Sequence, residues 1–167
     1  SSSNTNYYPN PILLDELNTN NGYVFISEPL QESLLVSGSF EGEIMASINK
    51  KDMDIGITLY ELLPTGTYFH LSYTIFRASY ARDITKRNLL TPNATETIPF
   101  TNTHLVSKQL KKGSRLAIFL DVNKNPFSQL NYGTGKDVSE ETIADGKEPL
   151  KIKWFTDSYV KIPVWKD

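Results

Sequence analysis

The sequence of 167 residues has no cysteine, only two histidines and no long apolar run. Without cysteine the chain has no disulfide framework and no thiolate nucleophile or metal ligand. No stretch approaches the roughly 20 apolar residues of a membrane-spanning helix, and the polar first residues do not form a signal peptide. The formal net charge of −2 gives no basic footprint for nucleic acid. We therefore expect a cytoplasmic protein of bacterial type with no nucleic-acid or membrane partner.

Lysines gather at one place, around Gly113, where Lys108, Lys111 and Lys112 occur. Glycine within a polar stretch is typical of a turn. We expect these lysines to lie in a solvated turn rather than in a nucleic-acid patch.

The chain divides by composition into a short polar segment and one longer unit. Residues 1–20 are rich in serine and asparagine, and we expect a linker or a truncated N-terminal segment there. Residues 21–167 are long enough for one domain with a substantial core.

Apolar and polar residues alternate through most of this unit, which is the period of a β-strand. Two such runs, at 55–59 and 69–75, flank the sequence Leu63-Pro64-Thr65-Gly66, in which Pro64 and Gly66 suit a tight turn. This pattern predicts a β-hairpin. Further strands are expected at residues 22–27, 34–38, 43–49, 96–100, 115–122, 150–155 and 159–164.

Strands at this spacing predict an all-β sandwich or barrel rather than alternating strands and helices. Short helices are expected at residues 80–90, with Asp83 as N-cap and Pro92 beyond the end, and at residues 138–145.

The sequence Gly133-Thr134-Gly135-Lys136 resembles the end of a phosphate-binding loop. That loop requires G-x-x-x-x-G-K-[S/T], whose backbone N–H groups and hydroxyl hold the phosphates and Mg²⁺. Here the spacing is too short, and Asp137 stands where the hydroxyl is needed. We instead predict a tight loop in which both glycines adopt positive φ.

No catalytic residue is predicted in this chain. A serine hydrolase needs a G-x-S-x-G elbow between a strand and a helix, and the sequence has none. His70 and His104 are far apart in sequence and form no H-x-x-x-H pair, so we expect surface or structural roles for both.

Asp52 and Asp54 are weak candidates for a metal site. Paired carboxylates near Glu41 and Glu43 are suitable oxygen ligands for Ca²⁺, but the full D-x-D-x-D-G loop is absent. The alternative is a polar start of a strand, in which Asp52 accepts backbone N–H bonds.

The aromatic residues are nine tyrosines, eight phenylalanines and two tryptophans. Trp154 alternates with apolar residues and is expected in the core. Trp165, Tyr159 and Tyr132 are candidates for exposed faces, which can stack on sugars or on another domain.

An ordered set of segments runs through residues 20–165. The segments are G-Y-V-F-I-S-E-P-L (22–30), L-L-V-S-G (34–38), D-M-D-I-G-I-T-L-Y-E-L-L-P-T-G (52–66), R-A-S-Y (77–80), I-P-F (98–100), G-S-R-L-A-I-F-L-D-V (113–122) and N-P-F…N-Y-G-T-G (125–135). In this order they resemble the C-terminal β-domain of the X-Pro dipeptidyl-peptidase and cocaine esterase (CocE/NonD) hydrolase family.

The resemblance implies a jelly-roll β-sandwich similar to galactose-binding domains. In that family the Ser, Asp and His of the triad lie in a preceding α/β-hydrolase domain, so no catalytic residue and no cofactor carries over. The jelly roll packs on the catalytic domain, shapes the edge of its cleft and can join oligomer contacts. The positions that carry over as fold or interface residues are Arg77, Ser79, Tyr80, Asn125, Pro126, Phe127, Asn131, Gly133, Thr134 and Gly135.

Two functions from different classes remain open at this stage. The first is an accessory domain of a serine hydrolase that cleaves either the amide after an N-terminal X-Pro pair or a small ester. In it, Arg77 pairs with a carboxylate across a domain interface or makes a polar contact within the sandwich. The alternative is a carbohydrate-binding module, with Trp165 or Tyr132 on an open face and Asp52 and Asp54 around a structural Ca²⁺.

Overall fold

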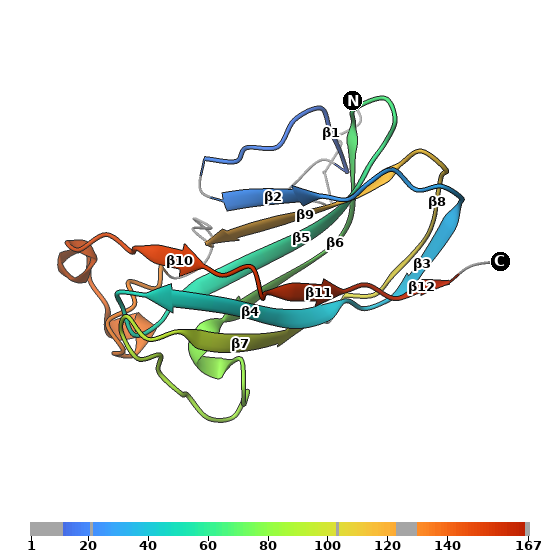
Figure 1. Ribbon diagram of the computed structural model, residues 1–167. Coiled ribbons are helices and arrows are strands. Elements are labelled where there is room, and N and C mark those ends of the chain that lie inside the picture. The colour runs from blue at the N-terminus through green and yellow to red at the C-terminus, as the bar shows by residue number, and fades with distance from the viewer. Residues whose placement is uncertain (1–11, 21, 103, 123–129, 166–167) are drawn as a thin grey trace, which may run out of the picture.

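The computed structural model describes residues 12–20, 22–102, 104–122 and 130–165. These residues form three antiparallel sheets, drawn in Figure 1. The five-stranded sheet has the order β1 (Leu13–Leu14), β6 (Tyr68–Arg77), β5 (Asp54–Leu62), β9 (Arg115–Val122) and β2 (Gly22–Ile26).

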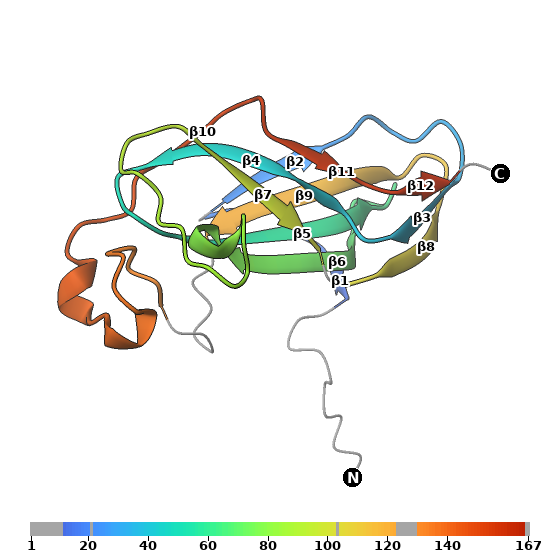
Figure 2. The same cartoon turned by 90° about the horizontal axis from the view of Figure 1, so that it is seen from below.

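The second sheet is built around β4 (Glu41–Ile48). The strand β7 (Glu96–Thr101) pairs with one edge of β4, and β10 (Ile152–Trp154) and β11 (Tyr159–Lys161) pair with the other. A third sheet contains β12 (Val164–Trp165), β3 (Leu34–Gly38) and β8 (Val106–Leu110). Figures 1 and 2 show the β4 sheet facing the five-stranded sheet, with the third sheet at one end of the two layers. The predicted all-β sandwich is confirmed.

The core lies between the first two sheets because one face of each strand is apolar. Ile55, Ile57 and Leu59 of β5 are at most 1% exposed. They belong to one cluster with Ile44, Ala46 and Ile48 of β4. Trp154 packs against this cluster from β10, as predicted. Burying a large aliphatic side chain contributes about 1.5–3 kcal/mol, so this row is a main source of stability.

The predicted hairpin is confirmed in its turn but wrong in part of its face pattern. Gly66 has φ 92°, and Leu63 and Thr67 close the turn with a 2.9 Å backbone hydrogen bond. The register between β5 and β6 shifts after Leu59, because Leu59 is opposite Ser72 whereas Tyr60 is opposite His70.

The extra residue of this bulge is Leu71, and it reverses the faces of the rest of β6. Ser72 and Thr74 are buried, whereas Tyr73 and Ile75 are 41% and 47% exposed. Alternation along the sequence would place Tyr73 and Ile75 in the core.

Most predicted strands are confirmed to within two residues. The strand β8 was not predicted, because its sequence V-S-K-Q-L has apolar residues at its two ends alone. The run predicted at 159–164 is two strands separated at Pro163, since proline does not donate to a ladder. Leu13 and Leu14 lie in the segment predicted as a linker, yet they pair with β6.

The helix predicted at 80–90 is wrong. A 3₁₀ turn, η1 (Ala78–Tyr80), ends where that helix would begin. Asp83 instead accepts hydrogen bonds from the backbone N–H and the hydroxyl of Thr85, which closes a local turn. Two further 3₁₀ turns, η2 (Val138–Glu140) and η3 (Ile143–Gly146), occupy the second predicted helical segment. None of the helical segments in the described residues is long and apolar enough to cross a bilayer.

A buried ion pair joins the five-stranded sheet to the third sheet. The Glu61 side chain is fully buried and pairs with Lys108 Nζ of β8, and it accepts a 2.7 Å bond from Ser114 Oγ. Burial alone would raise the pKa of Glu61, but hydrogen bonds from Lys108 and Ser114 lower it below its usual value of 4.5. Lys108 also lies 4.5 Å from the centre of the Phe69 ring. The solvated role predicted for Lys108 is therefore wrong.

Lys108→Met is expected to lower the free energy of unfolding by about 2–3 kcal/mol, because it leaves Glu61 charged and buried without its cation. This loss of unfolding free energy has its full size when the pH is above 4.5, the usual pKa of a glutamate. It becomes smaller as the pH falls through the lowered pKa of Glu61 in the folded state. Urea unfolding at several pH values measures it. Lys112→Met, at an exposed position of the neighbouring turn, is the control and changes stability by less than about 0.5 kcal/mol.

Candidate domain interface

Candidate residues from three separate segments meet at one end of the sandwich. They come from the start of β5, from the turn after β6, and from the loop at residues 131–136, which we call the Gly-Thr-Gly loop. We call this group the end cluster. Its members are Asp52, Asp54, Arg77, Ser79, Arg87, Asn131, Gly133, Thr134 and Gly135.

Asp52 is the buried centre of the end cluster, and its side chain is 0% exposed. Its Oδ1 atom accepts from the backbone N–H groups of Met53 at 2.9 Å and Ser79 at 3.0 Å. Its Oδ2 atom accepts from Ser79 Oγ at 2.7 Å and from Arg87 Nη2 at 3.1 Å. The predicted role of Asp52, which accepts backbone N–H bonds, is confirmed.

Arg87 extends the end cluster to the Gly-Thr-Gly loop. Its Nη1 atom donates to the carbonyl oxygens of Gly135 and Lys136. Nothing in the sequence marked this residue, because Asp52, Gly135 and Lys136, to which it bonds, lie 35 to 49 positions away. An arginine fork that reaches two carbonyls and a carboxylate fixes the loop against the start of β5.

Asp54 and Arg77 form an ion pair across β5 and β6. Arg77 Nε donates to Asp54 Oδ1 at 2.8 Å and Nη2 donates to Oδ2 at 3.2 Å. This bidentate pairing raises the pKa of Arg77, with a smaller contribution from the charge of Asp52. Asn131 Nδ2 donates to Asp54 Oδ1 at 3.0 Å. Of the two predicted roles for Arg77, the structure shows the polar contact within the sandwich.

The Gly-Thr-Gly loop has the predicted backbone, with φ of 76° at Gly133 and 89° at Gly135. A Cβ atom at Gly133 would lie 2.6 Å from the carbonyl oxygen of Asp52. Glu141 accepts bonds from the N–H groups of Tyr132 at 2.6 Å and Thr134 at 2.8 Å. The loop therefore surrounds the protein's own carboxylate where a phosphate-binding loop would hold an anion.

The carboxylates of the end cluster are occupied by donors of the protein itself. Both oxygens of Asp52 and of Asp54 accept hydrogen bonds from N–H, hydroxyl or guanidinium groups. No group of three or more His, Cys, Asp or Glu side chains in the described residues is arranged to hold a metal ion. Glu41 and Glu43 lie in β4, in the opposite sheet.

Of the other candidates, Tyr80 ends η1 and contributes to the raised pKa of Arg77. Asn125, Pro126 and Phe127 lie outside the described residues.

The aromatic residues proposed for sugar binding are not on one face. Trp165 of β12 is 64% exposed. Tyr132 is half-buried and packs on Gly146, where a Cβ atom would lie 2.7 Å from its ring. Figure 1 shows β12 and the segment around residues 132–146 at opposite ends of the sandwich.

Both histidines contact one tyrosine of the five-stranded sheet. The ring of His104 stacks on the ring of Tyr73 with centroids 4.6 Å apart, and the ring centroid of His70 lies 5.8 Å from that of Tyr73. Burial lowers the pKa of the half-buried His70. His104 is exposed, and the structure gives neither histidine a nucleophile to activate among the described residues.

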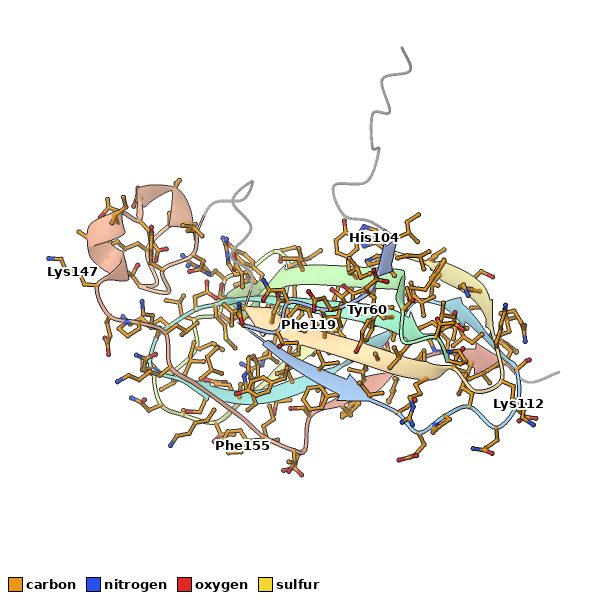
Figure 3. The ribbon with its side chains drawn as sticks, turned by 90° about the horizontal axis from the view of Figure 1, so that it is seen from above. Tyr60, His104, Lys112, Phe119, Lys147 and Phe155 are labelled. Atoms are coloured by element: carbon orange, nitrogen blue, oxygen red, sulfur yellow. The ribbon has the colours of Figure 1, made fainter. Side chains whose placement is uncertain are left out.

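The face of the five-stranded sheet that points away from the core, which we call the outer face, is mainly apolar and aromatic. The strand register places Tyr73, Thr58, Phe119 and Val24 in one row across four strands. Figure 3 looks onto this sheet, with Tyr60, Phe119 and His104 labelled. The residues that share the outer face are Val24, Ile26, Thr58, Tyr60, Leu62, Tyr68, His70, Tyr73, Ile75, Arg115, Ala117, Phe119 and Asp121.

Asp121 lies in the next row of the outer face, between two glycines. It is opposite Gly22 on β2 and Gly56 on β5, and a Cβ atom at Gly56 would lie 2.2 Å from Asp121 Oδ1. The carboxylate therefore lies across the sheet, where burial raises its pKa from 3.8 to about 6. It has no ion-pair partner among the described residues.

The sequence profile of the family described as the X-Pro dipeptidyl-peptidase C-terminal non-catalytic domain matches residues 2–152. No curated protein matches the sequence significantly.

Solved structures share the fold. A selenomethionine-labelled α-amino acid ester hydrolase is 21% identical over 87% of this chain, with a TM-score of 0.77. An aminopeptidase from a marine sediment archaeon (Thaumarchaeota) is 18% identical over 89% of this chain, also with a TM-score of 0.77. A CocE/NonD family hydrolase from Staphylococcus aureus is 13% identical over 87% of this chain, with a TM-score of 0.63. The chain covers 26%, 26% and 30% of these chains. It therefore spans about a quarter of their length.

Asp52→Ala is expected to lower the free energy of unfolding by about 3 kcal/mol, because it leaves the buried N–H of Ser79 and the Arg87 guanidinium without their acceptor. Urea unfolding measures the loss. Asp157→Ala, at an exposed turn, is the control with an expected effect below about 0.5 kcal/mol. An equally small effect at Asp52 would contradict its central role.

Asp121→Asn is expected to raise the melting temperature of this chain at about pH 8. The folded-state pKa of about 6 lies above the usual 3.8, so the contribution of Asp121 to stability is most favourable below pH 3.8 and falls as the pH rises through 6. The difference in melting temperature between Asp121→Asn and the wild type therefore grows between pH 3.8 and about pH 6 and vanishes below pH 3.8. Thermal unfolding against pH measures it, with Asp157→Asn as the control.

Proposed function

Because the chain belongs to the family of X-Pro dipeptidyl-peptidase C-terminal non-catalytic domains, we propose that it packs on the α/β-hydrolase domain of a longer polypeptide and shapes the edge of its cleft. The chain itself is an accessory, non-catalytic domain of such a hydrolase. The catalytic domain is its proposed partner, and no nucleic-acid or membrane partner is proposed.

The observation that supports this proposal is that the charged groups of the end cluster are all hydrogen-bonded within the domain. These groups, Asp52, Asp54, Arg77 and Arg87, all bond to one another or to backbone atoms of the same domain. A nucleophile or general base must instead offer its reactive atom to a substrate. The end cluster therefore supports a structural role, in which it holds loops at one end of the sandwich.

The proposed parent enzyme cleaves an acyl bond. The solved structures that share this fold are named as an ester hydrolase, an aminopeptidase and a CocE/NonD hydrolase, and all are roughly three times as long as this chain. We therefore propose that the parent enzyme cleaves either the amide bond after an N-terminal X-Pro pair or a small ester. A cytoplasmic location and homo-oligomer contacts stay predictions.

The carbohydrate-binding alternative gains no support from the structure. Of its two aromatic candidates, Trp165 is 64% exposed on β12, whereas Tyr132 is half-buried, and Figure 1 shows β12 and the segment around residues 132–146 at opposite ends of the sandwich. Its proposed Ca²⁺ ligands, Asp52 and Asp54, already accept hydrogen bonds through all four of their oxygens.

The purified 167-residue chain is expected to hydrolyse neither X-Pro-nitroanilides nor nitrophenyl esters, whereas the full-length polypeptide hydrolyses at least one of them. The control is the full-length polypeptide with the serine of its G-x-S-x-G elbow changed to alanine, which should lose activity. Turnover that stays proportional to the concentration of the isolated chain through repeated purification would overturn the proposal.

A further inference from the structure

The outer face is apolar where an exposed antiparallel sheet is normally polar. A sheet with one solvated face alternates between apolar residues inside and polar residues outside. Here Tyr73, Ile75 and Ile26 are 41%, 47% and 47% exposed, and they share the outer face with Phe119 and Val24. Contiguous apolar patches of this kind mark interaction surfaces.

One exposed side chain of this face is held in place by a buried polar network. Asn102 is 2% exposed, and its side chain accepts from the N–H of His104 and donates to the carbonyl oxygen of His104, each at 2.8 Å. Ser72 Oγ donates to the same carbonyl at 3.0 Å. The His104 ring then lies flat on Tyr73. This fixed pair reduces the entropy lost when a partner covers it.

The same face carries a carboxylate that needs a donor when water is removed. Asp121 is already half-buried between Gly22 and Gly56, and no cation of the described residues reaches it. Complete burial without a partner would be costly. A partner that covers the outer face must therefore bring an Arg, a Lys or an N–H group to this position.

The chain's own course favours one occupant. The strand β1 pairs with β6 at the edge of this sheet, so the first described strand of the domain lies at the edge that borders the outer face. The solved structures with this fold are roughly three times as long as the chain. The outer face also continues into the end cluster, because the Ile75–Gly56 row adjoins the Arg77–Asp54 row.

We propose that the outer face, centred on Tyr73, Ile75, His104 and Phe119, docks on the catalytic domain of the same polypeptide, which supplies an apolar surface and one hydrogen-bond donor to Asp121. This inference rests on the proposed function, and it adds which surface makes the contact and what chemistry the partner presents there.

Hydroxyl-radical footprinting of the isolated chain and of the full-length polypeptide tests the assignment. In the full-length protein Tyr73 and His104 are expected to lose most of their reactivity. Tyr159 and Trp165, which are 41% and 64% exposed away from the outer face, are the internal controls and keep theirs.

Two matched substitutions separate docking from folding. Ile75→Glu on the outer face and Val164→Glu on β12 alter strand residues of similar exposure, 47% and 45%. In the isolated chain both are expected to leave the melting temperature nearly unchanged. In the full-length polypeptide Ile75→Glu restores the reactivity of Tyr73 and His104, and Val164→Glu does not.

The outcomes distinguish this inference from the proposed function. If the full-length polypeptide is active and protects another surface while Tyr73 and His104 stay reactive, the docking face is wrong and the accessory role stands. If no surface of the domain is protected, both fail. Protection of Tyr73 that grows with the concentration of the isolated chain would show a second copy on the face and overturn the proposal.

Discussion

The buried carboxylate of Asp52 holds together the end of the sandwich on which the candidate residues lie. Its two oxygens accept four hydrogen bonds, from Met53, Ser79 and Arg87. A carboxylate without exposure is costly unless each acceptor position is used, so these contacts constrain one another. Arg87 in turn bonds to Gly135 and Lys136. The loop conformations at this end therefore form as one unit or not at all.

This constraint also explains why motifs that suggest chemistry perform none in the end cluster. The paired aspartates that resemble a metal site bond to arginines and amides, and the loop that resembles a phosphate site surrounds Glu141. In each case the protein supplies the counter-group that a ligand would otherwise provide. On the outer face the domain presents mainly apolar and aromatic side chains together with the carboxylate of Asp121.

Local features were predictable from the sequence, and features that depend on distant partners were not. The Pro64–Gly66 turn and the positive φ of Gly133 follow from residue types. The bulge at Leu71 has no sequence signature, yet it moves Tyr73 and Ile75 from the predicted core to the outer face. The resemblance selected Arg77 and the glycine loop as fold or interface positions, and the structure places both in the end cluster. Arg87 and β8 acquire their places through contacts far along the chain.

The bulge links the fold to the proposed docking, because a regular β6 would give the opposite surface. With no extra residue, Ser72 and Thr74 would face outward and Tyr73 inward. The bulge instead buries Ser72, where it bonds to the carbonyl of His104. One irregularity thus both places Tyr73 on the outer face and supplies the polar group that fixes His104 against it. A sheet whose outer surface had only to meet water would gain nothing from this arrangement, whereas a rigid aromatic pair lowers the cost of binding a neighbouring domain.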